Sequence, residues 1–362
     1  MNAPDSVSHG FGRRNILKFG AVGAIAAGAT AFAQKSAFAA PADSAQHLQA
    51  LYQDALDEGG RLVVWAGGSN PNQEAATRAA FLAAFPGTDA TFTVRYSPVQ
   101  AALVNRQLAL GGLEPDVVQL QTLYDFDHWK AANALLPYRP PGATKVFPGY
   151  RDPDDTYIGI NVRSFGRTVN SALVGAAEAP GDATDFLAPA FLDKIVFPDP
   201  TAEDAVLFAF YLITQKHGLG YLERLMAQRP LVVANAGATA AALNSGQRTV
   251  SLAHLAPLAP VTGQSLRYVV PRTDAFMSWP QTAAILRRAA NPAAAKLYLA
   301  WQLSAERQGL GPQWPARRDV TPPGGWRPIT AYNTSRTAFR EFLRDREEVE
   351  RYRAVIRTFV AP

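Results

Sequence analysis

The sequence predicts an α/β fold of two lobes, each a mixed and mostly parallel sheet flanked by helices. Short apolar runs alternate with helical patterns along the chain, which is typical of strands joined by crossover helices. An apolar strand, a Gly/Asn-rich loop and a helix start follow one another at Arg61–Gln73, and a similar succession begins at Phe191. With 362 residues the chain is also long enough for two separate hydrophobic cores.

The first 39 residues have the pattern of an export leader. Arg13 and Arg14, followed by Leu17-Lys18 and a short apolar stretch, resemble the twin-arginine signal. An Ala-x-Ala cleavage site at Ala37–Ala39 follows, with Ala31–Ala33 as a second candidate. We therefore expect residues 1–39 to be a signal peptide for the twin-arginine translocase, and the mature protein to be periplasmic.

Composition narrows the function of the mature part. The leader holds four of the 35 basic and one of the 30 acidic residues, which leaves 31 basic and 29 acidic residues in the mature part. This small net charge gives no support for nucleic acid as a partner. The chain has no cysteine, which excludes disulfides, a thiol nucleophile and iron–sulfur ligands.

Periodicity predicts the elements of the mature chain. The expected helices are Ala45–Glu58, Glu74–Phe85, Val99–Leu110, Phe126–Leu136, Ala205–Gln215, Thr239–Leu243, Pro292–Leu303 and Thr337–Phe359. The expected strands are Leu62–Ala66, Ala90–Tyr96, Pro115–Leu120, Tyr157–Val169, Lys194–Phe197, Leu231–Asn235, Ser265–Pro271 and Ala275–Ile285. Tyr157–Val169 is long enough to cross between lobes, and the last two strands are expected to form the return crossing. The charged C-terminal helix is expected to pack on the first lobe, with a partner-binding role as the alternative.

The loop after the first strand predicts a ligand site. Asn70 is expected to be an N-cap, with Pro71 at the first helical position and Gln73 reaching back to the Asn70 amide. Ligands bind beyond the carboxyl ends of strands in open α/β sheets, because free helix amides converge there. An ordinary strand-to-helix connection is the alternative.

Several segments then resemble the extracellular solute-binding proteins of ABC transporters, a group that includes ferric-ion binders. The segments that carry the resemblance are Ala183–Ile195, Gly246–Val250, Ala289–Tyr298 and Leu303–Gln308. The resemblance implies a type II-like periplasmic-binding-protein fold with a hinge of crossing strands, closing on a ligand. We expect lobe 1 to comprise residues 40–162 and 272–362, and lobe 2 to comprise residues 163–271.

This family reading implies a small solute in the cleft and an ABC permease as partner. The expected ligand-binding residues are Ser69, Asn70, Gln121, Thr122, Arg163, Thr201, Asn235, Trp65 and Tyr124. An organic anion or amine is the favoured ligand, with Arg163 as a counter-ion and Trp65 and Tyr124 as an apolar or stacking wall. The alternatives are that Trp65 belongs to the core, that Arg163 only bridges the lobes, and that Gln121 and Thr122 only satisfy backbone groups.

Iron is the alternative ligand. Ferric binders of this family place a tyrosine pair after the Gly246 turn, whereas Ser251–Leu258 contains no tyrosine and has His254 alone. We therefore expect no metal and no cofactor.

A catalytic function is not expected either. Ser69 lacks the second glycine of a G-x-S-x-G elbow, and the histidines of the mature chain have no zinc spacing. A periplasmic ligand sensor or hydrolase remains the alternative of another class.

Overall fold

The computed structural model describes residues 42–360, so the expected leader with Arg13 and Arg14 lies outside the described residues. The helices are α1 (Ala42–Asp57), α2 (Ala75–Ala84), α3 (Ser97–Leu110), α4 (Leu123–Ala131), α5 (Asp204–His217), α6 (Gly220–Ala227), α7 (Ala236–Asn244), α8 (Pro292–Gln302), α9 (Ala305–Gly309), α10 (Ala338–Arg344) and α11 (Arg346–Val360). The strands are β1 (Arg61–Gly67), β2 (Asp89–Arg95), β3 (Val117–Leu120), β4 (Leu135–Leu136), β5 (Ile158–Asn170), β6 (Ile195–Pro198), β7 (Leu231–Val233), β8 (Val250–His254), β9 (Leu266–Val269) and β10 (Met277–Leu286).

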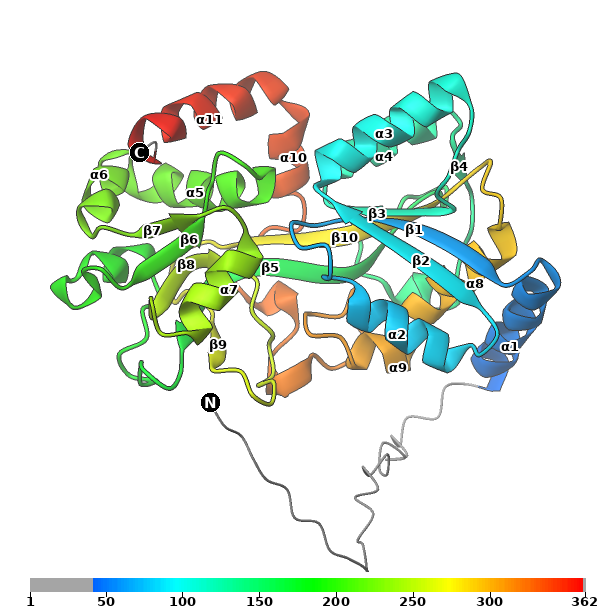
Figure 1. Cartoon of the computed structure of the whole chain (residues 1–362), viewed down its shortest axis with the longest axis horizontal. Coiled ribbons are helices and arrows are strands. Elements are labelled where there is room, and N and C mark those ends of the chain that lie inside the picture. Colours follow the sequence, from blue (N-terminus) through cyan, green and yellow to red (C-terminus); the bar gives the residue numbers. More distant parts are fainter. Residues whose placement is uncertain (1–41, 361–362) are drawn as a thin grey trace, which may run out of the picture. The chain divides into compact units, whose positions relative to one another are not determined.

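These strands form a mixed sheet in the order β2-β1-β3-β10-β5-β8-β6-β7, with β4 added to β10 and β9 added to β5. β1 pairs in parallel with β2 and β3, and β6 pairs in parallel with β7 and β8, as the alternation of strands and helices predicts. The two longest strands, β5 and β10, are antiparallel neighbours that run between the two ends of the sheet (Figure 1).

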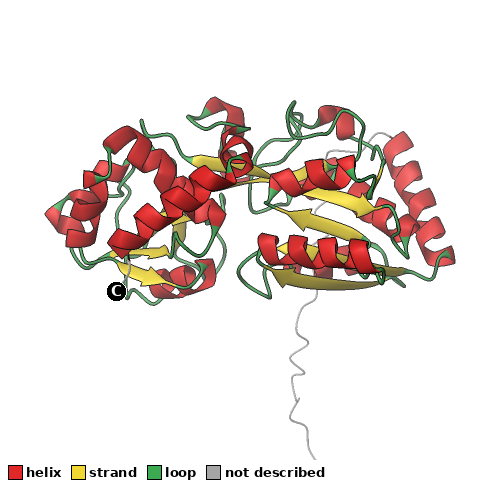
Figure 2. Ribbon diagram, turned by 90° about the horizontal axis from the view of Figure 1, so that it is seen from above, coloured by secondary structure: helices red, strands yellow, loops and turns green. Residues whose placement is uncertain are grey.

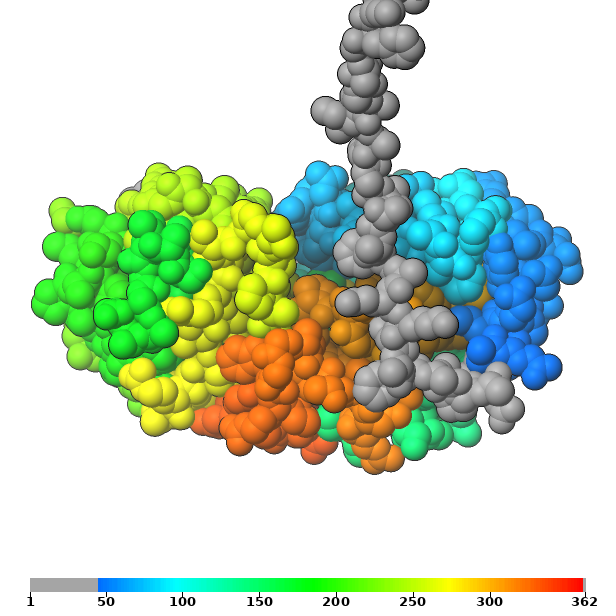
Figure 3. All heavy atoms as spheres, turned by 90° about the horizontal axis from the view of Figure 1, so that it is seen from below, coloured from blue at the N-terminus to red at the C-terminus, as the bar shows by residue number. Residues whose placement is uncertain are grey.

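Two groups of elements lie at the two ends of these long strands (Figure 2). We call β1–β4 with α1–α4 and α8 the first side, and β6–β9 with α5–α7 the second side. Each has its own buried core: Leu62, Phe81 and Tyr298 belong to the first, and Phe186, Phe197 and Phe210 to the second. In the space-filling view, blue-to-cyan residues form one side and green-to-yellow residues the other, with the orange segment that follows α9 between them (Figure 3).

The motifs that carry the family resemblance have structural roles on the first side. Asn291 precedes α8, and both its backbone N–H and its side-chain amide donate to the buried carboxylate of Asp116, which also accepts from the Val63 amide at 2.8 Å. Gln308 in α9 donates to the Ile160 carbonyl of β5, and its own side-chain oxygen accepts from the Ala316 amide. These contacts fasten the α8–α9 segment to the sheet.

Two expected elements differ from the structure. Helix α4 ends at Ala131 because Asn133 takes a positive φ of 53°, which releases Leu135–Leu136 to pair with β10. Two strands were expected to cross back between the lobes, and only β10 does so. β9 is a four-residue strand that pairs with the second-side end of β5.

The expected position of the C-terminal helix is wrong for most of its length. The segment forms two helices: α11 packs on α5 and α6 of the second side, whereas α10 contacts both α5 and α4, and its Arg340 and Arg344 pair with Asp127 of α4 (Figure 1). Its apolar residues Phe339, Phe342, Tyr352 and Ile356 belong to the same core as Phe208 of α5. The sequence shows that the segment has an apolar face, but it does not show which surface of the protein will cover that face.

Among residues 42–360, no helix combines the length and the apolar character needed to span a membrane.

Candidate ligand-binding cleft

The loops that follow the strands of the two sides approach each other beside β5, and two hydrogen bonds cross between them. Gln121 Nε2, directly after β3, donates to Glu203 Oε1 at the start of α5 over 2.8 Å. The Tyr96 hydroxyl, at the start of α3, donates to the Ala234 carbonyl after β7 over 3.5 Å. The cleft between the sides is therefore narrow here and lined by polar groups.

The loop after β1 does not begin a helix where the sequence predicted. Asn70 Oδ1 accepts from the Asn72 amide in a local turn, and α2 begins only at Ala75. Gln73 does not reach the Asn70 amide, because its side-chain nitrogen donates to the Gly67 carbonyl at 3.3 Å. Asn70 is thus free of the capping role and exposed, with the half-buried Ser69 before it.

Gly67 at the end of β1 leaves room for the side chain of Ser97. A Cβ on Gly67 would lie 1.9 Å from Ser97 Oγ. That hydroxyl accepts from the Gln121 amide at 3.2 Å, so the close approach at Gly67 helps to place Gln121 at the cleft.

Arg163 and Glu74 form an ion pair of 2.8 Å at the floor of the cleft. Arg163 projects from β5, and Glu74 precedes α2; their side chains are 12% and 5% exposed. The expected counter-ion for a ligand therefore already has a carboxylate partner within the protein.

Glu203 is the second carboxylate of the cleft. Shielding from solvent raises the pKa of Glu203, and the nearby charge of Asp204 adds to this; the Gln121 hydrogen bond and the more distant charge of Arg163 act in the opposite direction. Among the described residues no lysine or arginine pairs with it, since Arg163 pairs with Glu74 and Arg346 and Arg353 pair with Asp204. A cation placed beside Glu203 would stabilise its ionised form.

A cavity of about 290 Å³ opens on one flank of the Gln121–Glu203 contact. Gln121, Thr122 and Thr201 line it, so the structure brings three of the expected ligand residues together. Thr201 does not cap α5, because its hydroxyl donates to Asp199 Oδ1 at 2.8 Å and the helix begins only at Asp204. Tyr124 lies next to this cavity under Arg346, and burial raises the pKa of its phenol to about 12.

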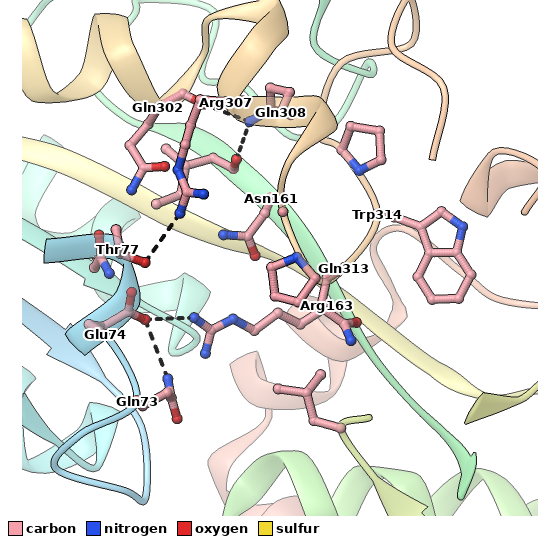
Figure 4. A pocket seen from close by; sticks show the side chains of 16 residues that line it. Gln73, Glu74, Thr77, Asn161, Arg163, Gln302, Arg307, Gln308, Gln313 and Trp314 are labelled. Carbon is pink, nitrogen blue, oxygen red and sulfur yellow. Dashed lines mark hydrogen bonds and ion pairs between the residues drawn. The ribbon is translucent and has the colours of Figure 1, made fainter. Parts of the chain in front are cut away.

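A second cavity, of about 130 Å³, lies on the other flank and contains Arg163 (Figure 4). Its walls come from the start of α2, from β5, from α9 and from the segment after α9. They carry mostly amide and charged side chains: Gln73, Glu74, Asn161, Gln302, Arg307 and Gln313.

Asn235 lies at the second-side edge of the cleft. Its side-chain oxygen accepts from the Ala238 amide at 2.9 Å, so it caps α7. Asn70 reaches this point from the first side: its side-chain nitrogen is 3.7 Å from the place a Cβ would occupy on Gly237. The structure thus brings Asn70 and Asn235 to the same helix start.

Trp65 is not brought to the cleft. It is 4% exposed and belongs to a first-side core with Val104 and Phe126, while Arg95 covers its ring at 5.9 Å. This agrees with the alternative that Trp65 is a core residue.

His254, the histidine considered as a metal ligand, lies in the protein interior. It is buried, its Nε2 lies 3.2 Å from the Ala236 carbonyl, and burial lowers its pKa to about 4. Within residues 42–360, no group of three or more His, Asp or Glu side chains is arranged to hold a metal ion.

Sequence reasoning missed Glu74, Tyr96 and Glu203. Glu203 lies between the expected strand Lys194–Phe197 and the expected helix Ala205–Gln215 and is not among the expected ligand residues. A signal was present in principle, since an acidic residue that directly follows a strand-loop near a helix start is a ligand candidate. Its role depends on Gln121, which the fold brings from 82 residues away.

Comparison with known proteins agrees with this geometry. The family model described as "Bacterial extracellular solute-binding protein" matches residues 120–310, more than half of the chain. No curated protein sequence matches.

Solved structures with a similar fold include the periplasmic binding protein AfuA and the protein HitA. AfuA from Actinobacillus pleuropneumoniae, solved with fructose-6-phosphate bound, is 19% identical with a TM-score of 0.64, over 83% of this chain and 98% of its own. Iron-bound HitA from Pseudomonas aeruginosa is 16% identical with a TM-score of 0.62, over 82% of this chain and 99% of its own. The fold is therefore that of periplasmic binding proteins, and the chain belongs to the bacterial extracellular solute-binding protein family.

Proposed function

We propose that this protein is the periplasmic solute-binding component of an ABC uptake transporter, exported by the twin-arginine translocase. The family membership and the cleft between two independently packed sides support this. We infer lobe boundaries near residues 162 and 272, as the sequence suggested, with α11 added to the second lobe because it packs on α5 and α6, and with α10 bridging α4 and α5. The proposal includes no catalytic step.

The proposed ligand is a small organic amine held beside Glu203. The single observation that carries this choice is that Glu203 lies across the cleft from Gln121 with only an amide as its partner. Arg163 is less available to an anionic ligand, because Glu74 already neutralises it. Of the two ligand classes that the sequence favours, the amine therefore fits the charges of the cleft better.

A thermal-shift screen of the mature protein tests this proposal. The probes are putrescine, ethanolamine, an amino-acid set and, as anions, acetate and phosphate, with and without Fe(III). A ligand specific to the folded state adds about 2.7 kcal/mol of stability at a hundredfold excess over its dissociation constant, so a true ligand gives a clear shift.

Two variants make the result specific to the cleft. Glu203→Gln keeps the shape but removes the charge, and we expect it to weaken amine binding by at least about tenfold. Glu223→Gln, an exposed residue of α6, is the control and should bind as the parent does. A shift with anions or Fe(III) alone, or amine binding that survives Glu203→Gln, would refute the amine assignment.

The transporter partner has a separate test. Permease and ATPase genes beside this gene, with loss of uptake of the identified amine on deletion, would support the transport role. A neighbouring sensor-kinase gene with unchanged uptake would contradict it.

A further inference from the structure

Helix α10 belongs to neither side alone. It lies between α4 of the first side and α5 of the second side, and it contacts both (Figure 1). Its aromatic residues join the second-side core, where Phe339 and Phe342 pack on Phe208 of α5 with ring centroids at 5.3 and 5.0 Å. These apolar contacts hold α10 on the second side, because separating the rings would expose them to water.

Toward the first side α10 presents two arginines, and both pair with Asp127 of α4. Arg340 donates to Asp127 Oδ1, and Arg344 donates to Asp127 Oδ2 at 2.9 Å. The hydroxyl of Tyr157, the residue before β5, donates to the same carboxylate at 2.6 Å and accepts from Arg340 at 2.7 Å. Partial burial acts to raise the pKa of Asp127, but the hydrogen bonds from these three residues outweigh it and lower the pKa, so the carboxylate is ionised at neutral pH. We call these four residues the Asp127 cluster.

A second contact crosses the same gap at the start of α11. Arg346 pairs with Asp204 of α5 at 3.1 Å, and its guanidinium lies over the ring of Tyr124 in α4, 5.7 Å from the ring centroid. The segment that begins with α10 therefore reaches α4 through charged side chains at two places, while its rings are packed against α5.

The positions of α4 and α5 connect this junction to the cleft. Gln121 lies two residues before α4, Glu203 lies directly before α5, and the two side chains are hydrogen-bonded to each other across the cleft. A contact that holds α4 beside α10 therefore also holds Gln121 close to Glu203. Asp127 is not among the residues that line the two cavities of the cleft, so it affects the cleft without touching a ligand.

We propose that the Asp127 cluster is an electrostatic latch that favours the closed arrangement of the two sides before any ligand is bound. When the sides separate about β5 and β10, the rings of α10 stay on the second side and the ion pairs with Asp127 break. The side chains of Asp127 and Arg344 are 34% and 56% exposed, so their ion pair is weak enough to open and is screened by salt.

The latch sets the fraction of molecules that are closed, and with it the apparent affinity of the cleft for its solute. This inference rests on the hinged binding protein of the proposed function, but it does not depend on which solute binds.

The distance between two spin labels in the ligand-free protein tests the latch. The chain has no cysteine, so labels on Asn72→Cys of the first side and Ala241→Cys of α7, both exposed, report how far apart the two sides are. We expect the parent to populate a short and a long distance, and Asp127→Asn to lower the ratio of short to long at least about threefold. Raising NaCl from about 0.05 to about 0.5 M should lower this ratio in the parent and have little effect in the variant, in which the ion pairs of the cluster are already lost.

Matched variants separate a latch from a general loss of structure. Arg344→Gln removes one of the two ion pairs across the gap and should change the distances in the same direction as Asp127→Asn. Arg351→Gln removes ion pairs with Glu347 and Glu348 that lie within α11, so it should leave the distances unchanged. Identical distances in the parent and in Asp127→Asn, a parent without the short distance, or an equal salt effect in both proteins would overturn the latch.

The result is independent of the amine screen, because the distances are measured without ligand. A failed amine screen together with a changed distance ratio would count against the proposed ligand and for the latch. Where the screen identifies an amine, Asp127→Asn should weaken its binding in proportion to the loss of the closed fraction. Unchanged amine affinity in a variant that has lost the short distance would contradict the link between the latch and the cleft.

Discussion

His254 is a buried base whose effect on stability has a definite sign. Burial lowers its pKa from 6.5 to about 4, so between these values the unfolded chain binds a proton that the folded chain does not. Stability contributed by neutral His254 is present above pH 6.5 and is lost as the pH falls toward 4, by roughly 3 kcal/mol in total. Asp125 acts in the opposite sense, because burial raises its pKa to about 6 and its contribution is lost as the pH rises.

We predict that His254→Gln removes the pH dependence of stability that His254 causes and keeps the one that Asp125 causes. The free energy of unfolding of the parent minus that of the variant should rise from pH 4 to pH 6.5 and stay constant above it. Urea unfolding at one-unit pH intervals measures this difference, in which the Asp125 contribution cancels. Parallel curves for parent and variant would show that His254 titrates normally in the folded protein.

Individual residues could be predicted from the sequence where their contacts are to residues nearby in the chain. Asn235 is expected at the end of a strand as a ligand residue, and in the structure it caps α7 through an amide three residues away. Glu203 was missed, because what makes it notable is Gln121 from the other side of the sheet. Its importance depends on a long-range contact that no local pattern encodes.

Among the elements, the C-terminal helices show how periodicity can find a face without its partner. The sequence predicts one charged helix over Thr337–Phe359, but the apolar stripe of such a helix matches any complementary surface. In the structure Tyr352 donates to or accepts from Thr214 Oγ1 at 2.8 Å, and Arg346 and Arg353 pair with Asp204 at the start of α5. These polar contacts, between residues about 140 positions apart, place α11 on the second side. Arg340 and Arg344 of α10 pair instead with Asp127 of α4 on the first side.

The packing of α11 predicts a large effect of a single truncation. Ile356 is completely buried in the core that contains Phe208, so Ile356→Ala should lower the free energy of unfolding by about 2–5 kcal/mol. Arg357→Ala, at an exposed neighbouring position, should have little effect. Urea unfolding followed by circular dichroism compares the two. Equal stability of both variants would mean that α11 is not part of the second-side core in solution.

For the whole molecule, the crossing strands were the most predictable feature. A 13-residue alternating segment is too long for an ordinary strand, and β5 spans both sides as expected. The strands that lead back to the first side were predicted less well. Hydrophobic alternation does not reveal that Leu266–Val269 is a short strand that stays on the second side.

The arrangement of the two sides predicts that ligand binding brings Asn70 and Gly237 together. The Asn70 amide nitrogen lies 3.7 Å from a Cβ built on Gly237, and the chain has no cysteine of its own. We therefore expect Asn70→Cys combined with Gly237→Cys to be bridged faster by a short bis-maleimide, which adds one cysteine thiol to each of its double bonds, when the amine found in the screen is present, because the ligand favours the closed cleft. Rates of cross-linking, followed by gel mobility, measure this.

A control pair within one side separates closure from a general change in thiol reactivity. Lys216 and Thr273 are exposed and in contact on the second side, so Lys216→Cys with Thr273→Cys should cross-link at a rate independent of the ligand. If the two sides move as a hinged pair about β5 and β10, only the pair across the cleft responds. Equal ligand effects on both pairs, or none on the pair across the cleft, would mean that the ligand binds without closing the two sides, and its affinity would then have to come from one side alone.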